Sequence, residues 1–84
     1  MNEKVAKALT DSNVVKFGEF ALVSGNISPI YVDLRVLPSY PDSMAIITEE
    51  LVKIVKKLNP DVIAGAETAG IPLATAISLK TKIP

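Results

Sequence analysis

Apolar residues recur with a helical period in three parts of the chain. The first is a short stretch, residues 3–9, and the second is residues 43–58, where the apolar face is longest and most regular. Asp42 or Ser43 is the expected N-cap of this second helix, because short polar side chains accept hydrogen bonds from the free amides of a first turn. Residues 71–79 predict a third helix, with a proline in its first turn, where the missing N–H is tolerated.

Two further patterns are typical of strands. Residues 17–23 and 30–37 are strand-like runs, and residues 24–29 between them are turn-forming throughout, which predicts an antiparallel hairpin with a polar loop. Residues 61–66 form a short apolar run of the kind found in central parallel strands, which are buried on both faces. Residues 83–84 have the pattern of an entry to another strand.

This order of elements predicts an α/β fold. A strand buried on both faces needs parallel neighbours, and the helix that follows it needs a strand to return to. The sequence reaches Pro84 where that strand is expected to start. We therefore expect residues 1–41 to form an N-terminal helix and hairpin, and residues 42–84 to form the start of an α/β core that is truncated after its first βα unit.

The composition excludes several kinds of site. The 84 residues include no cysteine and no histidine, which excludes disulfides, thiolate or imidazole zinc sites and histidine-based acid–base catalysis within the chain. Nine basic residues balance nine acidic ones, so we expect no nucleic-acid partner. No apolar stretch is long enough to span a membrane and the N-terminus lacks a signal-peptide pattern, so we expect a cytoplasmic, soluble protein with no membrane partner. Because 49% of the residues are hydrophobic, the apolar excess should be buried in an oligomer or in a larger core.

The segment 65–70 is the strongest candidate for chemistry on pattern alone. It is a glycine-bounded turn between a predicted strand and a predicted helix, and backbone N–H groups at such a helix N-terminus suit a phosphate or pyrophosphate. The alternative is an ordinary βα connection that binds nothing, since neither the dinucleotide fingerprint nor the Walker spacing is present. Glu67 also places a negative charge there, which favours an anion only if its side chain points away.

Other polar positions have simpler interpretations. Residues 24–29 offer hydroxyls and amides, yet a plain polar turn explains them. Asp33 and Arg35 fall on the same face of the predicted strand, and a surface ion pair is favoured over a ligand clamp. Tyr31 fits an ordinary strand aromatic.

Three blocks of sequence together resemble one enzyme family, the orotate phosphoribosyltransferases. Residues 17–35, FGEFALVSGNISPIYVDLR, resemble the N-terminal signature of that family, and residues 37–41, LPSYP, resemble its continuation in archaeal-looking members. Residues 63–74, IAGAETAGIPLA, resemble its pyrophosphate loop. The blocks follow the family's order and spacing, and from first to last they span residues 17–74.

The resemblance implies the N-terminal part of a type I phosphoribosyltransferase fold, in which residues 1–41 form a hood over a parallel α/β core. The family transfers ribose 5-phosphate from phosphoribosyl pyrophosphate (PRPP) to orotate, giving orotidine 5′-monophosphate and pyrophosphate in de novo UMP synthesis. It also implies Mg²⁺ bound through PRPP, with no metal ligand in this segment, and a homodimer.

The resemblance also implies roles for individual residues. The hood residues facing orotate are Val23, Ser24, Gly25, Tyr31 and Val32, and the residues holding pyrophosphate are Glu67, Thr68, Ala69 and Gly70. Many bacterial members carry lysines where this chain has Val23 and Ala69. No catalytic residue is expected in the segment, because the family's flexible loop of Arg, Lys and His and its acidic pair are absent. The segment alone is therefore expected to be inactive.

Two alternatives remain open at this point. One is a phosphoribosyltransferase for another base, whose base-reading residues would lie outside these 84. The other is a short, non-catalytic binding or dimerisation protein of the same fold. A gene that continues past Pro84 into an Arg- and Lys-rich loop and an acidic pair would favour the enzyme.

Overall fold

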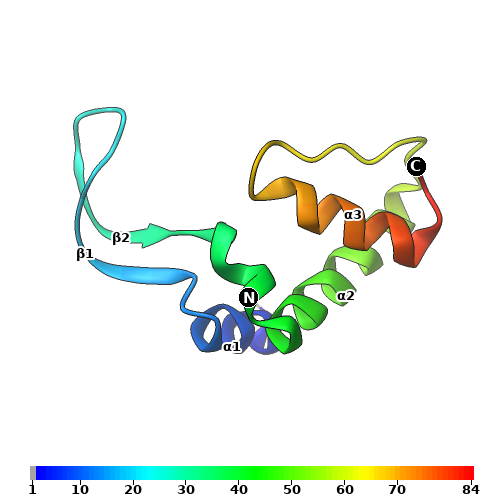
Figure 1. The fold of residues 1–84 in the computed structure, drawn as a ribbon, viewed down its shortest axis with the longest axis horizontal. Coiled ribbons are helices and arrows are strands. Elements are labelled where there is room, and N and C mark those ends of the chain that lie inside the picture. The colour runs from blue at the N-terminus through cyan, green and yellow to red at the C-terminus, as the bar shows by residue number, and fades with distance from the viewer. Residues whose placement is uncertain (1) are drawn as a thin grey trace.

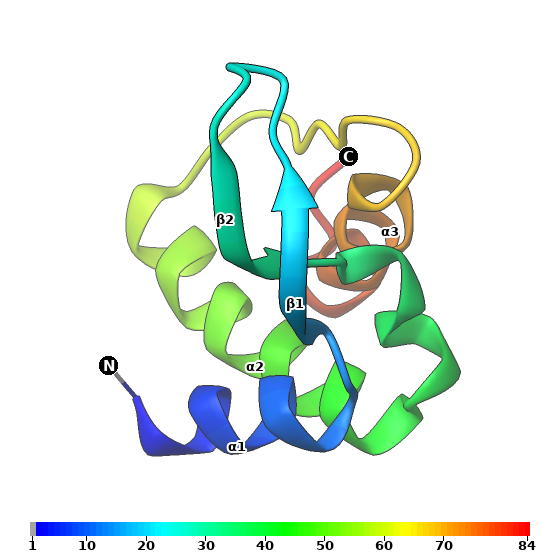
Figure 2. The ribbon, with the colours of Figure 1, turned by 90° about the vertical axis from the view of Figure 1, so that its left-hand side faces the viewer.

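The computed structural model describes residues 2–84 and shows three α-helices, one 3-10 helix and a β-hairpin in this part of the chain (Figure 1). The elements in chain order are α1 (Glu3–Asp11), β1 (Val15–Ala21), β2 (Ile27–Val32), the 3-10 helix η1 (Leu34–Ser39), α2 (Pro41–Leu58) and α3 (Gly70–Thr81). Helix α2 packs against α1 and also against α3, and the hairpin projects away from the helices (Figures 1 and 2). The three predicted helices are confirmed, each somewhat longer than its periodic stretch.

The predicted antiparallel hairpin is also confirmed, with a shifted loop. Val15 pairs with Val32 at its base and Ala21 pairs with Ile27 near its tip. The connection is therefore shorter than residues 24–29 and begins earlier, with the Gly25 N–H donating to the Leu22 carbonyl at 2.9 Å. Gly25 has a φ of 90°, a conformation that glycine adopts without a steric penalty.

The second predicted strand is wrong beyond β2, because residues 34–37 turn into η1. Asp33 is the N-cap of this helix, and its carboxylate accepts the Arg35 backbone N–H at 3.2 Å. This local capping bond outweighs the strand propensity of the residues that follow. The turn also redirects Leu37, which becomes completely buried.

The hydrophobic core lies where α1, η1 and α2 meet. Its buried members are Ala8, Val14, Leu37 and Ile47, one from each of α1, the following connection, η1 and α2. The core therefore ties the base of the hairpin to the helices, and it leaves the rest of the hairpin outside.

Helix α2 begins earlier than expected. Tyr40 occupies the N-cap position and Pro41 the first helical position, so the expected N-cap at Asp42 or Ser43 is wrong. A proline at this position has its backbone angle already set for a helix and loses no hydrogen bond. At the other end the helix stops where its periodic stretch stops, at Leu58, with Asn59 in the left-handed conformation and its N–H bonded to the Val55 carbonyl at 2.9 Å.

Residues 61–66 are not a strand in this structure, contrary to the expectation. The segment runs across the top of α2 and α3 in Figure 1, and Val62 is 65% exposed. The Ile63 N–H donates to the Pro84 carbonyl at 2.7 Å, which places the end of the chain beside this segment. A buried central strand needs neighbours on both sides. Among residues 2–84 the backbone bonds to this segment are the one to Pro84 and a turn bond from the Gly70 N–H to the Ala66 carbonyl, and neither comes from a neighbouring strand.

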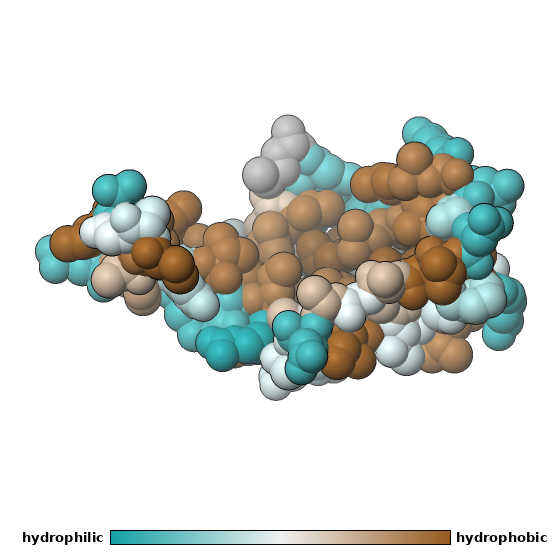
Figure 3. Space-filling model, turned by 90° about the horizontal axis from the view of Figure 1, so that it is seen from above, coloured by the Kyte–Doolittle hydropathy of each residue, from teal (hydrophilic) through white to brown (hydrophobic). Residues whose placement is uncertain are grey.

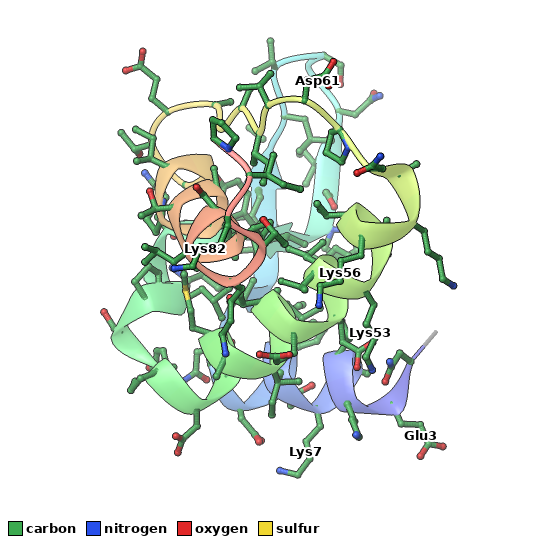
Figure 4. The ribbon with its side chains drawn as sticks, turned by 90° about the vertical axis from the view of Figure 1, so that its right-hand side faces the viewer. Glu3, Lys7, Lys53, Lys56, Asp61 and Lys82 are labelled. Atoms are coloured by element: carbon green, nitrogen blue, oxygen red, sulfur yellow. The ribbon has the colours of Figure 1, made fainter. Side chains whose placement is uncertain are left out.

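Apolar side chains reach the surface over much of the molecule. Figure 3 shows them gathered on the face seen from above, across the middle of the molecule and along part of the hairpin. Charged side chains are exposed on several elements, and Glu3 and Lys7 extend from the edge of the molecule in Figure 4. None of the helices in the described residues is long and apolar enough to cross a membrane.

Thr48 gives a first testable consequence of the packing. Its hydroxyl is buried in α2 and has no hydrogen-bond partner among residues 2–84. We expect Thr48→Val to raise the free energy of unfolding by about 1 kcal/mol, because it removes an unsatisfied polar group and keeps the shape of the side chain. Denaturant unfolding followed by circular dichroism measures the change.

Thr75→Val is the matched control. The Thr75 hydroxyl is exposed and donates to the Ile71 carbonyl at 2.9 Å, so its loss should not stabilise the protein. A Thr48→Val protein no more stable than the Thr75→Val protein contradicts the prediction.

Candidate functional site

A cleft of about 470 Å³ lies between the end of the hairpin and the turn before α3. One wall is formed by Tyr31, Val32, Asp33, Leu34 and Arg35, and the other by Ala66, Glu67, Thr68, Ala69 and Gly70. The cleft thus joins two segments more than thirty positions apart in the sequence. Each segment contains residues that the sequence indicates as candidates, from separate motifs. These are Tyr31 and Val32 in the first segment and Glu67, Thr68, Ala69 and Gly70 in the second.

The remaining hood residues lie elsewhere. Val23, Ser24 and Gly25 are exposed at the tip of the hairpin and do not line the cleft. The structure therefore places Tyr31 and Val32 opposite the loop and leaves the other three apart from it, so an orotate contact by the tip stays a prediction.

The turn before α3 is built on two glycines in close contact. A Cβ added to Gly65 would lie 2.8 Å from the Ala74 Cβ and closer still to the Gly70 carbonyl oxygen. A Cβ added to Gly70 would meet the Gly65 backbone at 3.3 Å. The chain folds back on itself here because neither position carries a side chain.

The turn leaves several backbone amides available. The Gly70 N–H donates to the Ala66 carbonyl at 2.9 Å, and the Ile71 N–H donates to the Thr68 carbonyl at 3.4 Å. Within the described residues no such bond engages the amides of Glu67, Thr68 or Ala69. Free amides at the start of a helix are suited to an anion. The Glu67 side chain is exposed, and the peptide bond between Glu67 and Thr68 is cis.

The opposite wall contains a charged cluster. Asp33 is only 6% exposed, and its Oδ1 accepts from the Arg35 Nε at 2.8 Å while its Oδ2 accepts from an Arg35 Nη at 3.1 Å. The Lys16 ammonium lies 3.2 Å from the same Oδ2. The hydrogen bond from Arg35 is the main cause that lowers the pKa of the Asp33 carboxyl far below its usual value, against the opposing effect of burial.

The predicted ion pair between Asp33 and Arg35 is confirmed, but the Asp33 carboxylate is buried and only the Arg35 side chain lies at the surface. The carboxylate is buried because Asp33 caps η1, which begins at Leu34 and turns the chain inward, as a continuing strand would not do. Sequence reasoning thus missed Arg35 as a cleft residue. A signal was present, since an aspartate followed by an apolar segment with a nearby proline is typical of a capped helical turn.

The Asp33 cluster predicts an acid-sensitive fold. In the unfolded chain an aspartate titrates near 3.9, and in the folded protein its pKa is much lower. The contribution of Asp33 to stability is therefore fully present above about pH 4 and is lost as the pH falls from there toward the folded pKa. We expect the free energy of unfolding to fall over this range, as measured by denaturant unfolding at a series of pH values.

Asp33→Asn should lower stability at neutral pH and flatten this acid dependence, so that the two proteins converge at low pH. Asp61→Asn, on an exposed segment, is the control and should leave the curve of the parent chain unchanged. Parallel curves for the parent chain and Asp33→Asn would contradict the prediction.

Acidic side chains do not gather into a metal site in the described part of the chain. Residues 2–84 contain no group of three or more acidic side chains placed to hold a metal ion. In the cleft, both Asp33 oxygens are engaged by cations, and Glu67 is the other carboxylate of the lining.

The chain is similar in sequence to several curated proteins. It is 44% identical over 78 residues to the orotate phosphoribosyltransferase of Sulfolobus acidocaldarius, which covers 93% of this chain and 40% of that protein. It is 37% identical over 86 residues to the orotate phosphoribosyltransferase of Pyrococcus abyssi, covering 100% of this chain and 47% of that protein. The chain thus spans less than half the length of these relatives. No protein-family model matches it.

Solved structures give the same result for the fold. The chain superposes on UMP synthase of Leishmania donovani with a TM-score of 0.90 and 46% identity, covering 96% of this chain and 18% of that one. It superposes on orotate phosphoribosyltransferase from Aeropyrum pernix with a TM-score of 0.84 and 28% identity, covering 95% and 49%. The expected fold class, the N-terminal part of a type I phosphoribosyltransferase, is confirmed. In sequence and in fold, this chain belongs to the orotate phosphoribosyltransferase family as the counterpart of its N-terminal portion.

Proposed function

We propose that this chain supplies the orotate-facing wall and the pyrophosphate turn of an enzyme that makes orotidine 5′-monophosphate from orotate and PRPP. The observation that carries the proposal is the cleft, which places Tyr31 and Val32 opposite the turn from Glu67 to Gly70. In this proposal residues 1–41 act as the hood and residues 42–84 begin the α/β core.

The chemistry of the two walls fits the two substrates. The amides of Glu67, Thr68 and Ala69 can donate to phosphate oxygens, and the start of α3 adds its favourable dipole. Tyr31 offers an aromatic surface to a planar ring, and its own ring is held by Phe20, whose centroid lies 5.5 Å away. Val23, Ser24 and Gly25 would close over orotate from the hairpin tip.

Three further properties belong to the same proposal. Mg²⁺ would arrive on the phosphates of PRPP and neutralise charge on the departing pyrophosphate, without a ligand from this chain. A homodimer would cover part of the exposed apolar surface, and the protein would act in the cytoplasm in UMP synthesis.

The 84 residues alone should form no product. Stabilising a departing pyrophosphate requires positioned cations, and in the described residues the cleft lining contributes Arg35 as its cationic side chain. The amides of the turn can position one end of PRPP, but the resemblance assigns the ribose phosphate and catalytic groups to segments that these residues do not include.

The proposal is tested with a chimera. Residues 1–84 are joined to the part of the Sulfolobus acidocaldarius relative that lies beyond the match, and the protein is purified from a host that lacks its own orotate phosphoribosyltransferase. We expect this chimera to form orotidine 5′-monophosphate from orotate and PRPP, and residues 1–84 alone to form none.

The unaltered relative is the positive control. The negative control is the relative without the region that matches residues 1–84 of this chain. If a folded chimera binds PRPP but transfers to another base only, that base takes the place of orotate in the proposal. A folded chimera without any transfer would refute it.

A further inference from the structure

Arg35 is the sole arginine among the 84 residues, and it lines the cleft. Its side chain is 63% exposed, while the Asp33 carboxylate that holds it is buried. Lys16 binds the same carboxylate but lies outside the cleft lining. The cluster thus carries two positive charges and one negative charge, and the cation that reaches the cleft is Arg35.

The guanidinium keeps free donors in this arrangement. Arginine has five N–H donors in a rigid fork. The bonds to Asp33 use the Nε donor and one Nη donor, which leaves three for other partners. Because two parallel bonds fix the plane of the guanidinium, the free donors are held in a defined orientation and are less mobile than those of a solvent-exposed arginine.

Asp33 itself is fixed from several sides. Its carboxylate accepts the Arg35 backbone N–H at 3.2 Å, and its own N–H donates to the Val14 carbonyl at 2.8 Å. Val14 is completely buried in the core. The orientation of Arg35 is therefore set by the core of the protein through one buried carboxylate.

We propose that Arg35, positioned by Asp33, binds an oxyanion group of the ligand in the cleft through its free N–H donors. The matching chemistry is a group with two oxygens on one centre, a carboxylate or a phosphate. The inference deepens the proposed function, on which it rests for the occupant of the cleft: orotate offers the first group and the pyrophosphate end of PRPP the second. Asp33 acts as a positioning residue and does not touch the ligand.

The test uses the 84-residue chain labelled with ¹⁵N throughout. Because the sequence has one arginine, its Nε–H signal is single and needs no further assignment. Sodium pyrophosphate is titrated until the amide signals of Glu67, Thr68 and Ala69 stop moving, and orotate is titrated separately over the same range of concentrations. We expect the Arg35 Nε–H signal to shift with one of the two anions, and that anion identifies the group which Arg35 binds.

Three variants separate a ligand contact from a structural role. Arg35→Gln should weaken binding of the identified anion about tenfold, the loss expected for a charge-assisted hydrogen bond, and leave the other anion unaffected. Asp33→Asn keeps the arginine but releases it, so its Nε–H signal should lose the shift on titration. Lys16→Ala removes the other cation on Asp33 and should bind both anions as the parent chain does.

The outcomes distinguish this inference from the proposed function. If the amides of the turn shift but the Arg35 signal and the affinities of Arg35→Gln do not change, the inference is wrong and the proposed function stands. If Arg35 responds as expected but the chimera makes no product, the proposed function fails and the anion contact stands. If neither the turn nor Arg35 responds to either anion, both are overturned.

Discussion

Gly65→Ala is expected to abolish product formation by the chimera while the helices remain folded. The new Cβ would lie 2.8 Å from the Ala74 Cβ and closer still to the Gly70 carbonyl oxygen, a backbone atom that cannot rotate away. The turn must therefore open, which displaces the amides of Glu67, Thr68 and Ala69. We expect PRPP affinity to fall at least tenfold, because several charge-assisted hydrogen bonds are misplaced together.

Gly70→Ala is the matched control for the same chemical change. Its Cβ would meet the Gly65 backbone at 3.3 Å, so a small adjustment relieves the contact, and alanine favours the start of α3. Gly70→Val adds a branched side chain and should weaken PRPP far more than orotate. Glu67→Gln, at an exposed side chain, should do little. Equal PRPP affinity in Gly65→Ala and the parent chimera, measured by calorimetric titration, contradicts the prediction.

Val62→Asp should affect the stability of the 84-residue chain and of the chimera differently. In the 84-residue chain Val62 is 65% exposed, so we expect a change within about 0.5 kcal/mol in the free energy of unfolding. In the chimera the segment can gain strand neighbours on both sides, and an aspartate there would bury an unpaired charge. We expect a loss of about 3–5 kcal/mol in the chimera.

Thermal and denaturant unfolding of both proteins measure the difference. Val23→Asp, at the exposed tip of the hairpin, is the control and should leave the stability of both proteins unchanged. If Val62→Asp leaves the chimera as stable as its parent, then residues 61–66 are not a buried central strand in it.

The parts of the fold that were predicted correctly are those determined by local periodicity. The apolar face of α2 repeats over residues 43–58, and the stop at Asn59 depends on its own backbone conformation. Residues 61–66 were not predictable in the same way. Their apolar composition is typical of a strand that lies between two other strands. Such a strand forms only where another backbone supplies its hydrogen bonds. In the described residues Pro84 provides one such bond.

The candidate site was predictable only in part, for a related reason. The two glycines of the turn indicate from the sequence that two backbone segments approach closely there. The motif around Tyr31 indicates the other wall of the cleft. The meeting of the two walls depends on packing between distant elements. Arg35 was missed because its orientation depends on the hydrogen bond by which Asp33 caps η1. The sequence pattern instead predicts a strand that continues to Leu37.

The hairpin has the geometry of a lever whose fulcrum is Asp33. Its base is fastened to the core by the bond between the Asp33 N–H and the Val14 carbonyl, whereas its far end projects away from the helices (Figure 1). A rotation about this fulcrum displaces the tip, with Val23, Ser24 and Gly25, by far more than it displaces Tyr31 and Val32. Such a rotation would therefore leave Tyr31, Val32 and Arg35, which line the cleft, nearly stationary while the tip moves.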